Sequence, residues 1–174
     1  MPTFNPRRIV FAVYKGVSLL DLAGPLEAFR VADAFSPSRN GRSMYECTVV
    51  SSRGGRVMTA DGVELGTKPT RSLTKKAIDT VVVPGGFQVD DVTRDRALVQ
   101  WIRNIAPGCK RVCSVCVGSF LLAEAGILDS RRAATPLVAC VPSCQPLPGG
   151  ESGTGFHFRS RWPGVEFSRR NFGH

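Results

Sequence analysis

The stretch RVCSVCVGSFLL, residues 111–122, decides the fold because it begins as a buried β-strand and continues as an α-helix. Cys116 lies at the corner between the two elements, and Gly118 removes a Cβ where the chain has to turn tightly. A cysteine in front of a helix faces the positive end of the backbone dipole and unpaired N–H donors, which favour its anion. We therefore predict a strand–turn–helix in which the pKa of the Cys116 thiol is lowered, with an anion site beside it.

The rest of the chain predicts strands that alternate with helices. A continuous apolar run occupies residues 8–14 and is typical of a strand covered on both faces, and a second strand is predicted at 47–51 and a third, buried one at 79–84. Apolar residues recur at three- and four-residue steps over 18–35 and 95–106, which predicts two helices, with Gly24-Pro25 at a start or a kink of the first. A hairpin turn is expected at 53–56. This order favours an α/β fold with a mostly parallel sheet flanked by helices.

Candidate site residues follow three of the predicted strands. Parallel sheets bind ligands at the carboxyl ends of their strands, where Asp21, the turn Gly85-Gly86 and Cys116 are expected. If they converge, the Asp21 carboxyl can hold the thiol or a substrate proton, while N–H groups of Gly85, Gly86 and Val117 stabilise an oxyanion. Structural alternatives remain for each: Asp21 as a helix cap, the glycines as a tight turn and Cys116 as a small buried thiol.

Length, charge and cysteine content restrict the possible function classes. The chain has 174 residues, 43% of them hydrophobic, which suits a single domain. The net charge is +9, but basic and acidic residues are mixed and no helix-turn-helix pattern occurs, so this chain itself is not expected to bind nucleic acid. The absence of a long apolar run and of a signal peptide predicts no membrane span and a cytoplasmic protein with reduced thiols. We expect no cofactor. We also expect no metal site, because the side chains of Cys113 and Cys116 should point to different sides.

Several motifs are spaced along residues 7–135. They are LDLAGP at 20–25, VPGG at 83–86, SVCVGSFLLA at 114–123, AGILD at 125–129 and RRAAT at 131–135. Together they resemble the ThiJ/PfpI group of class I glutamine amidotransferase-like proteins. The resemblance is strongest to the N-terminal domain of AraC-type transcription regulators of the GlxA sort, and nearly as strong to isonitrile hydratases.

The resemblance implies a flavodoxin-like sandwich with a nucleophile elbow at Cys116, an acidic partner at Asp21 and oxyanion-type donors around Gly86 and Val117. It also implies a pocket for an unidentified small molecule and pairing into a homodimer. Val117 stands where the family has threonine and hydrolytic relatives have histidine, so this neighbour supplies no base. We therefore expect ligand sensing without turnover. The alternative is a hydratase or hydrolase in which Cys116 attacks the substrate as a nucleophile and Asp21 acts as general acid and base.

The chain changes character after Thr135. Residues 136–174 are rich in proline and glycine and lack periodicity, and Pro136-Leu137 stand where the family carries His-Trp. Back-translation shifted by one base gives a tail that begins HWSRACRVASRYPEV, which is close to the family's continuation. We therefore expect a partial ThiJ/PfpI domain at 1–135 and an irregular, out-of-frame tail at 136–174, so that the sandwich is truncated and the DNA-binding domain is lost. The alternative is an evolved low-complexity tail, and the nucleotide sequence across codon 136 distinguishes the two.

Overall fold

The centre of the protein is a six-stranded sheet with the order β3-β4-β2-β1-β5-β6. The computed structural model describes residues 5–35, 43–73, 78–87 and 93–129, and the backbone of 132–133 and 166–167. The strands are β1 (Arg7–Ala12), β2 (Tyr45–Ser51), β3 (Gly55–Met58), β4 (Glu64–Pro69), β5 (Thr80–Val83) and β6 (Arg111–Ser114). Only the pair β3–β4 within this sheet is antiparallel, so the predicted mostly parallel α/β fold is confirmed.

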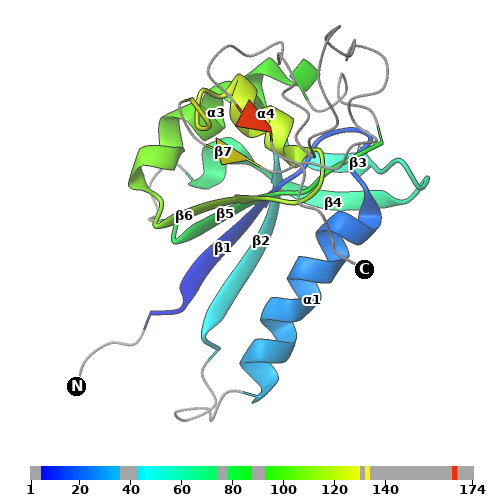
Figure 1. Ribbon diagram of the computed structural model, residues 1–174. Coiled ribbons are helices and arrows are strands. Elements are labelled where there is room, and N and C mark those ends of the chain that lie inside the picture. Colours follow the sequence, from blue (N-terminus) through cyan, green and yellow to red (C-terminus); the bar gives the residue numbers. More distant parts are fainter. Residues whose placement is uncertain are drawn as a thin grey trace, which may run out of the picture.

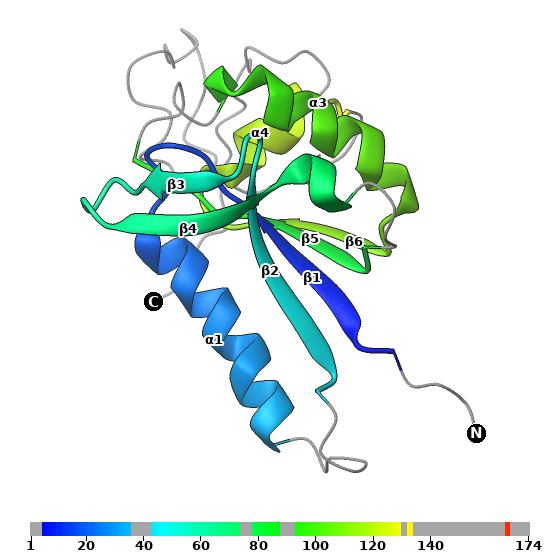
Figure 2. The same cartoon turned by 180° about the vertical axis from the view of Figure 1, so that it is seen from behind.

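Helices cover both faces of the sheet. Helix α1 (Leu19–Phe35) lies on one face, and α3 (Arg96–Ile105) and α4 (Gly118–Glu124) lie on the other (Figures 1 and 2). The side chain of Phe11 in β1 is completely buried and meets Phe29 of α1 edge-on, with ring centroids 6.3 Å apart. On the opposite face, Trp101 and Phe120 are buried.

Helix α1 begins at Leu19, so Gly24-Pro25 does not mark its start. The Ser18 hydroxyl accepts a hydrogen bond from the Asp21 N–H at 3.3 Å, and the Asp61 carboxylate accepts one from the Leu19 N–H at 2.9 Å. These two side chains satisfy free donors of the first turn. The cap role that the sequence left open for Asp21 is therefore taken by Ser18, and the Asp21 side chain is available for the site.

The hairpin is not where we predicted it. Strands β3 and β4 pair antiparallel with Val57 opposite Leu65, so the chain reverses between them and not at 53–56. The Thr59 N–H donates to the Val63 carbonyl at 2.9 Å, and Gly62 adopts a φ of 82° in this turn. The physical reason is that β4, and not β3, joins β2 as its parallel neighbour. Gly54 and Gly55, with φ of 76° and 81°, redirect the chain from β2 into the outer strand.

Arg103 of α3 fixes the end of α4. Its guanidinium donates to the carbonyls of Ala125 at 3.1 Å and Glu124 at 3.0 Å, which the helix itself leaves unpaired. Asp95 caps the start of α3 by accepting from the Leu98 N–H at 3.0 Å. The two helices are therefore joined through a side chain at the helix terminus, and α4 carries the Cys116 turn at its other end.

Replacing Arg103 by alanine is expected to lower the free energy of unfolding by about 1 kcal/mol, because two carbonyls lose charged donors at a partly solvated position. Urea denaturation measures the change. The matched control is Arg30→Ala, whose ion pair with Glu27 is well exposed and is expected to contribute less than about 0.5 kcal/mol. Equal effects of the two substitutions would contradict the role of Arg103 at the helix end.

The remaining expectations about the tail concern residues outside the described part. Residues 136–174 lie there, apart from the backbone of β8 (Glu166–Phe167), which pairs in parallel with β7 (Arg132–Ala133). Among the described helices, none combines the length and the apolar character needed to cross a bilayer.

Candidate functional site

The predicted strand–turn–helix at Cys116 is present, but its strand is not buried as predicted, because β6 lies at the edge of the described sheet and Arg111, Cys113 and Ser114 are exposed. Strand β6 ends at Ser114, the Val115 N–H donates to the Val83 carbonyl at 2.9 Å, and α4 begins at Gly118. Cys116 has a φ of 51° and is the one residue other than glycine with a positive φ among the described residues. This conformation costs a side-chain-bearing residue about 1–2 kcal/mol. The surrounding contacts therefore hold Cys116 in a strained turn, as expected for an elbow.

Gly118 is required by the close approach of α4 to the end of β5. A Cβ at this position would lie 2.2 Å from the Val83 carbonyl oxygen and 2.8 Å from the Pro84 carbonyl oxygen. Both atoms belong to the backbone, so they cannot move aside as a flexible side chain would. The absence of a side chain at Gly118 lets the turn fold back on the neighbouring strand, as predicted from the sequence.

Asp21 and Cys116 both lie next to Gly85. A Cβ on Gly85 would lie 2.5 Å from the Asp21 carboxylate Oδ2 and 2.8 Å from the Cys116 Cβ. The Ser18 N–H donates to the Gly85 carbonyl at 2.9 Å, which fastens the start of α1 to this turn. The Cys116 thiol is hydrogen-bonded to the Asp21 side chain. Three segments that are distant in the sequence therefore converge, as the positions of the residues after their strands predicted.

The other two predicted donors, Gly86 and Val117, lie beside this pair. Gly86 forms an antiparallel bridge with Val17, and a Cβ on it would lie 2.7 Å from the Gly16 carbonyl oxygen. The Val117 N–H is hydrogen-bonded to the Cys116 sulfur, and the Val117 side chain is buried. The Val117 donor is thus directed at the sulfur, whereas oxyanion binding by Gly85 and Gly86 stays a prediction.

The predicted lowering of the Cys116 pKa is wrong. Burial raises the pKa of the thiol, and the charge and hydrogen bond of Asp21 raise it further, while the Val117 N–H lowers it. The half-buried sulfur is therefore held as a thiol that donates to the carboxylate. The sequence argument considered the helix terminus alone, but α4 has only seven residues and a carboxylate lies next to the sulfur. At rest the site is a thiol–carboxylate pair and not a thiolate.

Two supporting residues were not singled out from the sequence. Ser18 stands three positions before Asp21, the spacing of a helix-capping serine and an acidic residue of the first turn, so its signal was present. The Tyr14 hydroxyl donates to the Pro84 carbonyl at 3.2 Å and thereby supports the loop that carries Gly85. A tyrosine at the end of an apolar strand gives no local sign of this role, because its partner is 70 positions away.

No group of three histidine, cysteine or acidic side chains is placed to hold a metal within the ranges that the structure describes. Cys113 is exposed on β6 whereas Cys116 is half-buried at the elbow. The Asp21–Cys116 pair is placed for hydrogen bonding and proton exchange.

Comparison with known proteins identifies a family whose model covers the segments that meet at this site. The DJ-1/PfpI family model matches residues 7–140, which include the Asp21, Gly85 and Cys116 segments. The chain belongs to the DJ-1/PfpI family. This confirms the family resemblance drawn from the motifs, and DJ-1beta of Drosophila melanogaster, with a TM-score of 0.62 at 15% identity over 75% of this chain and 66% of that one, has a similar fold.

Similar proteins differ in how much of their own length this chain covers. A protein of the cpoL 5′ region of Streptomyces lividans is 36% identical over 76% of this chain and 89% of its own length. The HTH-type transcriptional regulator GbdR of Pseudomonas aeruginosa is 33% identical over 72% of this chain but only 32% of its own length. The isonitrile hydratase of Pseudomonas putida is 31% identical over 74% of this chain and 51% of its own length. The chain therefore spans about a third of the regulator and half of the hydratase.

Proposed function

We propose that the DJ-1/PfpI domain of this chain is a small-molecule-sensing domain of the type found in AraC-type transcription regulators, and that it binds its ligand without turnover. The supporting observation is the thiol–carboxylate pair: burial and the Asp21 carboxylate raise the pKa of the Cys116 thiol. Because the thiol hydrogen is engaged by the carboxylate, such a pair offers a ligand the remaining acceptor atoms of Asp21 but little thiolate for attack at neutral pH. The similarity to GbdR, a transcriptional regulator, supports the same class.

A thermal-shift screen with small polar metabolites tests this proposal. A ligand of the site is expected to raise the Tm of the wild-type protein, because it binds the folded state alone. The shift should be lost in Asp21→Ala and retained in Asp61→Ala, which removes a carboxylate that serves the helix start. Mass spectrometry of the ligand after incubation should show it unchanged. Conversion of the ligand into a product would contradict sensing without turnover.

A cysteine-dependent hydratase is the second candidate, because the Asp21 carboxylate already accepts the proton that the Cys116 thiol would release. In this mechanism the sulfur attacks an electrophilic carbon while its proton passes through the Asp21 carboxylate to the substrate. Water then adds to the same carbon and the C–S bond breaks, which regenerates the thiol. An alkyl isonitrile is the direct probe, since addition of water converts it into an N-alkyl formamide that mass spectrometry detects. Formamide production that is lost in Cys116→Ala and retained in Cys113→Ala would establish this candidate, and no production by the wild-type protein would exclude it.

A further inference from the structure

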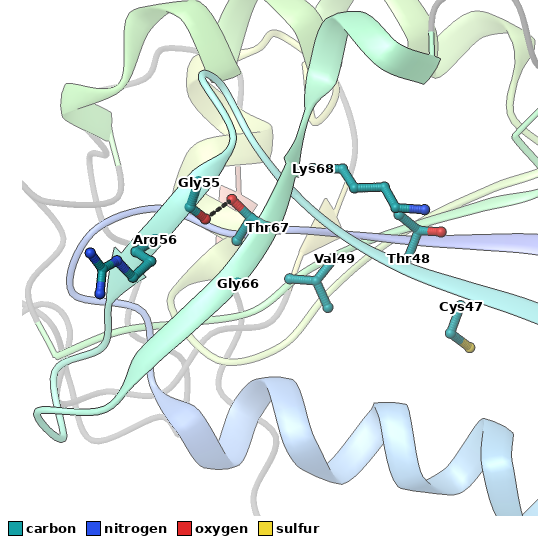
Figure 3. A pocket seen from close by; sticks show the side chains of 8 residues that line it. All are labelled: Cys47, Thr48, Val49, Gly55, Arg56, Gly66, Thr67 and Lys68. Atoms are coloured by element: carbon teal, nitrogen blue, oxygen red, sulfur yellow. Dashed lines mark hydrogen bonds between the residues drawn. The ribbon is translucent and has the colours of Figure 1, made fainter.

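Strands β2 and β4 meet only at their carboxyl-terminal ends. They pair at Val50 with Lys68 and at Ser51 with Pro69, and the preceding part of β4, in the β3–β4 hairpin, lies away from β2 (Figure 2). A hollow of about 500 Å³ lies between the separated strands (Figure 3), and a second, more enclosed hollow of about 170 Å³ adjoins it. Thr48 and Lys68 line both hollows, so these two side chains stand at their junction.

The smaller hollow combines apolar walls with a positive charge that no acidic group among the described residues balances. Val10, Leu73 and Ile78 supply the apolar walls. Arg8 also lines it, but its guanidinium pairs with the Glu46 carboxylate at 3.0 Å, which balances its charge.

Lys68 differs from Arg8 because no hydrogen bond or ion pair engages its ammonium within the part of the chain that the structure describes, and the same holds for the Thr48 hydroxyl. Figure 3 shows the Lys68 ammonium and the Thr48 hydroxyl pointing in the same direction from neighbouring strands. A cation beside a hydroxyl donor, neither of them engaged by another described residue, is an arrangement that can bind a carboxylate.

The size of the smaller hollow restricts what can accompany the carboxylate. A cavity of about 150 Å³ lined by apolar side chains holds benzene, so this hollow has room for one ring or a short branched chain. We propose that it is a second ligand site, which binds a small organic monocarboxylate with its carboxylate on Lys68 and Thr48 and its apolar part against Val10, Leu73 and Ile78.

This site is separate from the Asp21–Cys116 pair. Arg8 and Glu46 are each the second residue of their strands, so the hollow extends to the amino-terminal end of the sheet. Cys116 instead follows the carboxyl-terminal end of β6. A ligand in the hollow therefore does not need the elbow, and the two sites can be tested independently.

Calorimetric titration of the full chain with sodium benzoate tests the proposal. We expect saturable binding that weakens about tenfold or more in Lys68→Met, which keeps the apolar stem and removes the charge. Thr48→Val should weaken binding about threefold, since it removes one hydroxyl donor at nearly constant volume. Benzyl alcohol, which has the same ring without the negative charge, should bind at least about tenfold more weakly than benzoate.

Two control variants distinguish binding in this hollow from binding elsewhere on the protein. Lys15→Met removes the same charge from an exposed lysine outside both hollows and should leave benzoate binding unchanged. Cys116→Ser should also leave it unchanged, whereas Ile78→Trp should block it by filling the hollow. Absence of saturable benzoate binding, equal weakening by Lys68→Met and Lys15→Met, or loss of binding in Cys116→Ser would each overturn the proposal. Circular dichroism of every variant verifies folding. If Lys68→Met does not fold, the loss of benzoate affinity in Thr48→Val tests the proposal.

Discussion

Gly118→Ala is expected to lower the free energy of unfolding by about 3 kcal/mol or more, because the new methyl group has no space. Its Cβ would lie 2.2 Å from the Val83 carbonyl oxygen and 2.8 Å from that of Pro84. This overlap can be removed only if α4 or the end of β5 shifts. The hydrogen bond from the Val115 N–H to the Val83 carbonyl opposes such a shift. The substitution should therefore also displace Cys116 from Asp21, so that stability and the site are affected together.

Urea denaturation followed by circular dichroism measures the loss of stability in Gly118→Ala. The matched control is Gly108→Ala, because a Cβ on Gly108 would meet nothing within 4 Å. This control should leave stability unchanged or raise it by up to about 1 kcal/mol through a smaller entropy of the unfolded chain. A Gly118→Ala protein as stable as the wild type would show that α4 is not packed against β5 as described.

Asp21→Asn is expected to increase the rate at which iodoacetamide alkylates Cys116 at pH 7. The Asp21 charge raises the pKa of the thiol, so its removal in a substitution that keeps a side-chain acceptor increases the thiolate fraction. A decrease of one pKa unit gives about tenfold more thiolate, and the weaker nucleophilicity of that thiolate reduces the gain to roughly threefold. In the wild-type protein the alkylation rate should rise with pH beyond the range at which an ordinary thiol, with a pKa near 8.5, has become fully reactive.

Peptide mass mapping resolves the individual cysteines in this experiment. The exposed Cys113 is the internal reference, and its rate should be the same in the wild type and in Asp21→Asn. Asp61→Asn is the control for a carboxylate of the same region that contacts the start of α1 instead of the thiol. Wild-type Cys116 that reacts as fast as Cys113 at pH 7, or shows no response to Asp21→Asn, would refute the thiol–carboxylate pair.

The alternation of strands and helices was predictable because it depends on local patterns. The apolar runs of β1 and β5 and the three- and four-residue spacing in α1 and α3 each lie within one segment. The hairpin was misplaced because Gly54-Gly55 is a strong turn signal. Whether a turn joins paired strands depends on which strand becomes the neighbour of β2, and that neighbour is β4.

The site residues were predictable from their position after strands, but their chemical state was not. Cys116, Asp21 and Gly85 converge because parallel strands end at the same edge of the sheet. The direction of the pKa shift depends on burial and on the distance between sulfur and carboxylate, which only packing sets. Lys68 and Thr48 gave no sequence signal at all, because the hollow that they share exists only where β2 and β4 separate.

The sequence by itself determined the α/β order, the elbow at Cys116, the need for glycine at 118 and membership of the family, because these depend on short-range pattern and motif. Tertiary structure alone decided that the thiol stays protonated and that a lysine with no partner in the described part of the chain lines two hollows. Both outcomes depend on groups brought together across the sheet, where burial and neighbouring charge, and not the local sequence, control the energy of an ionised side chain.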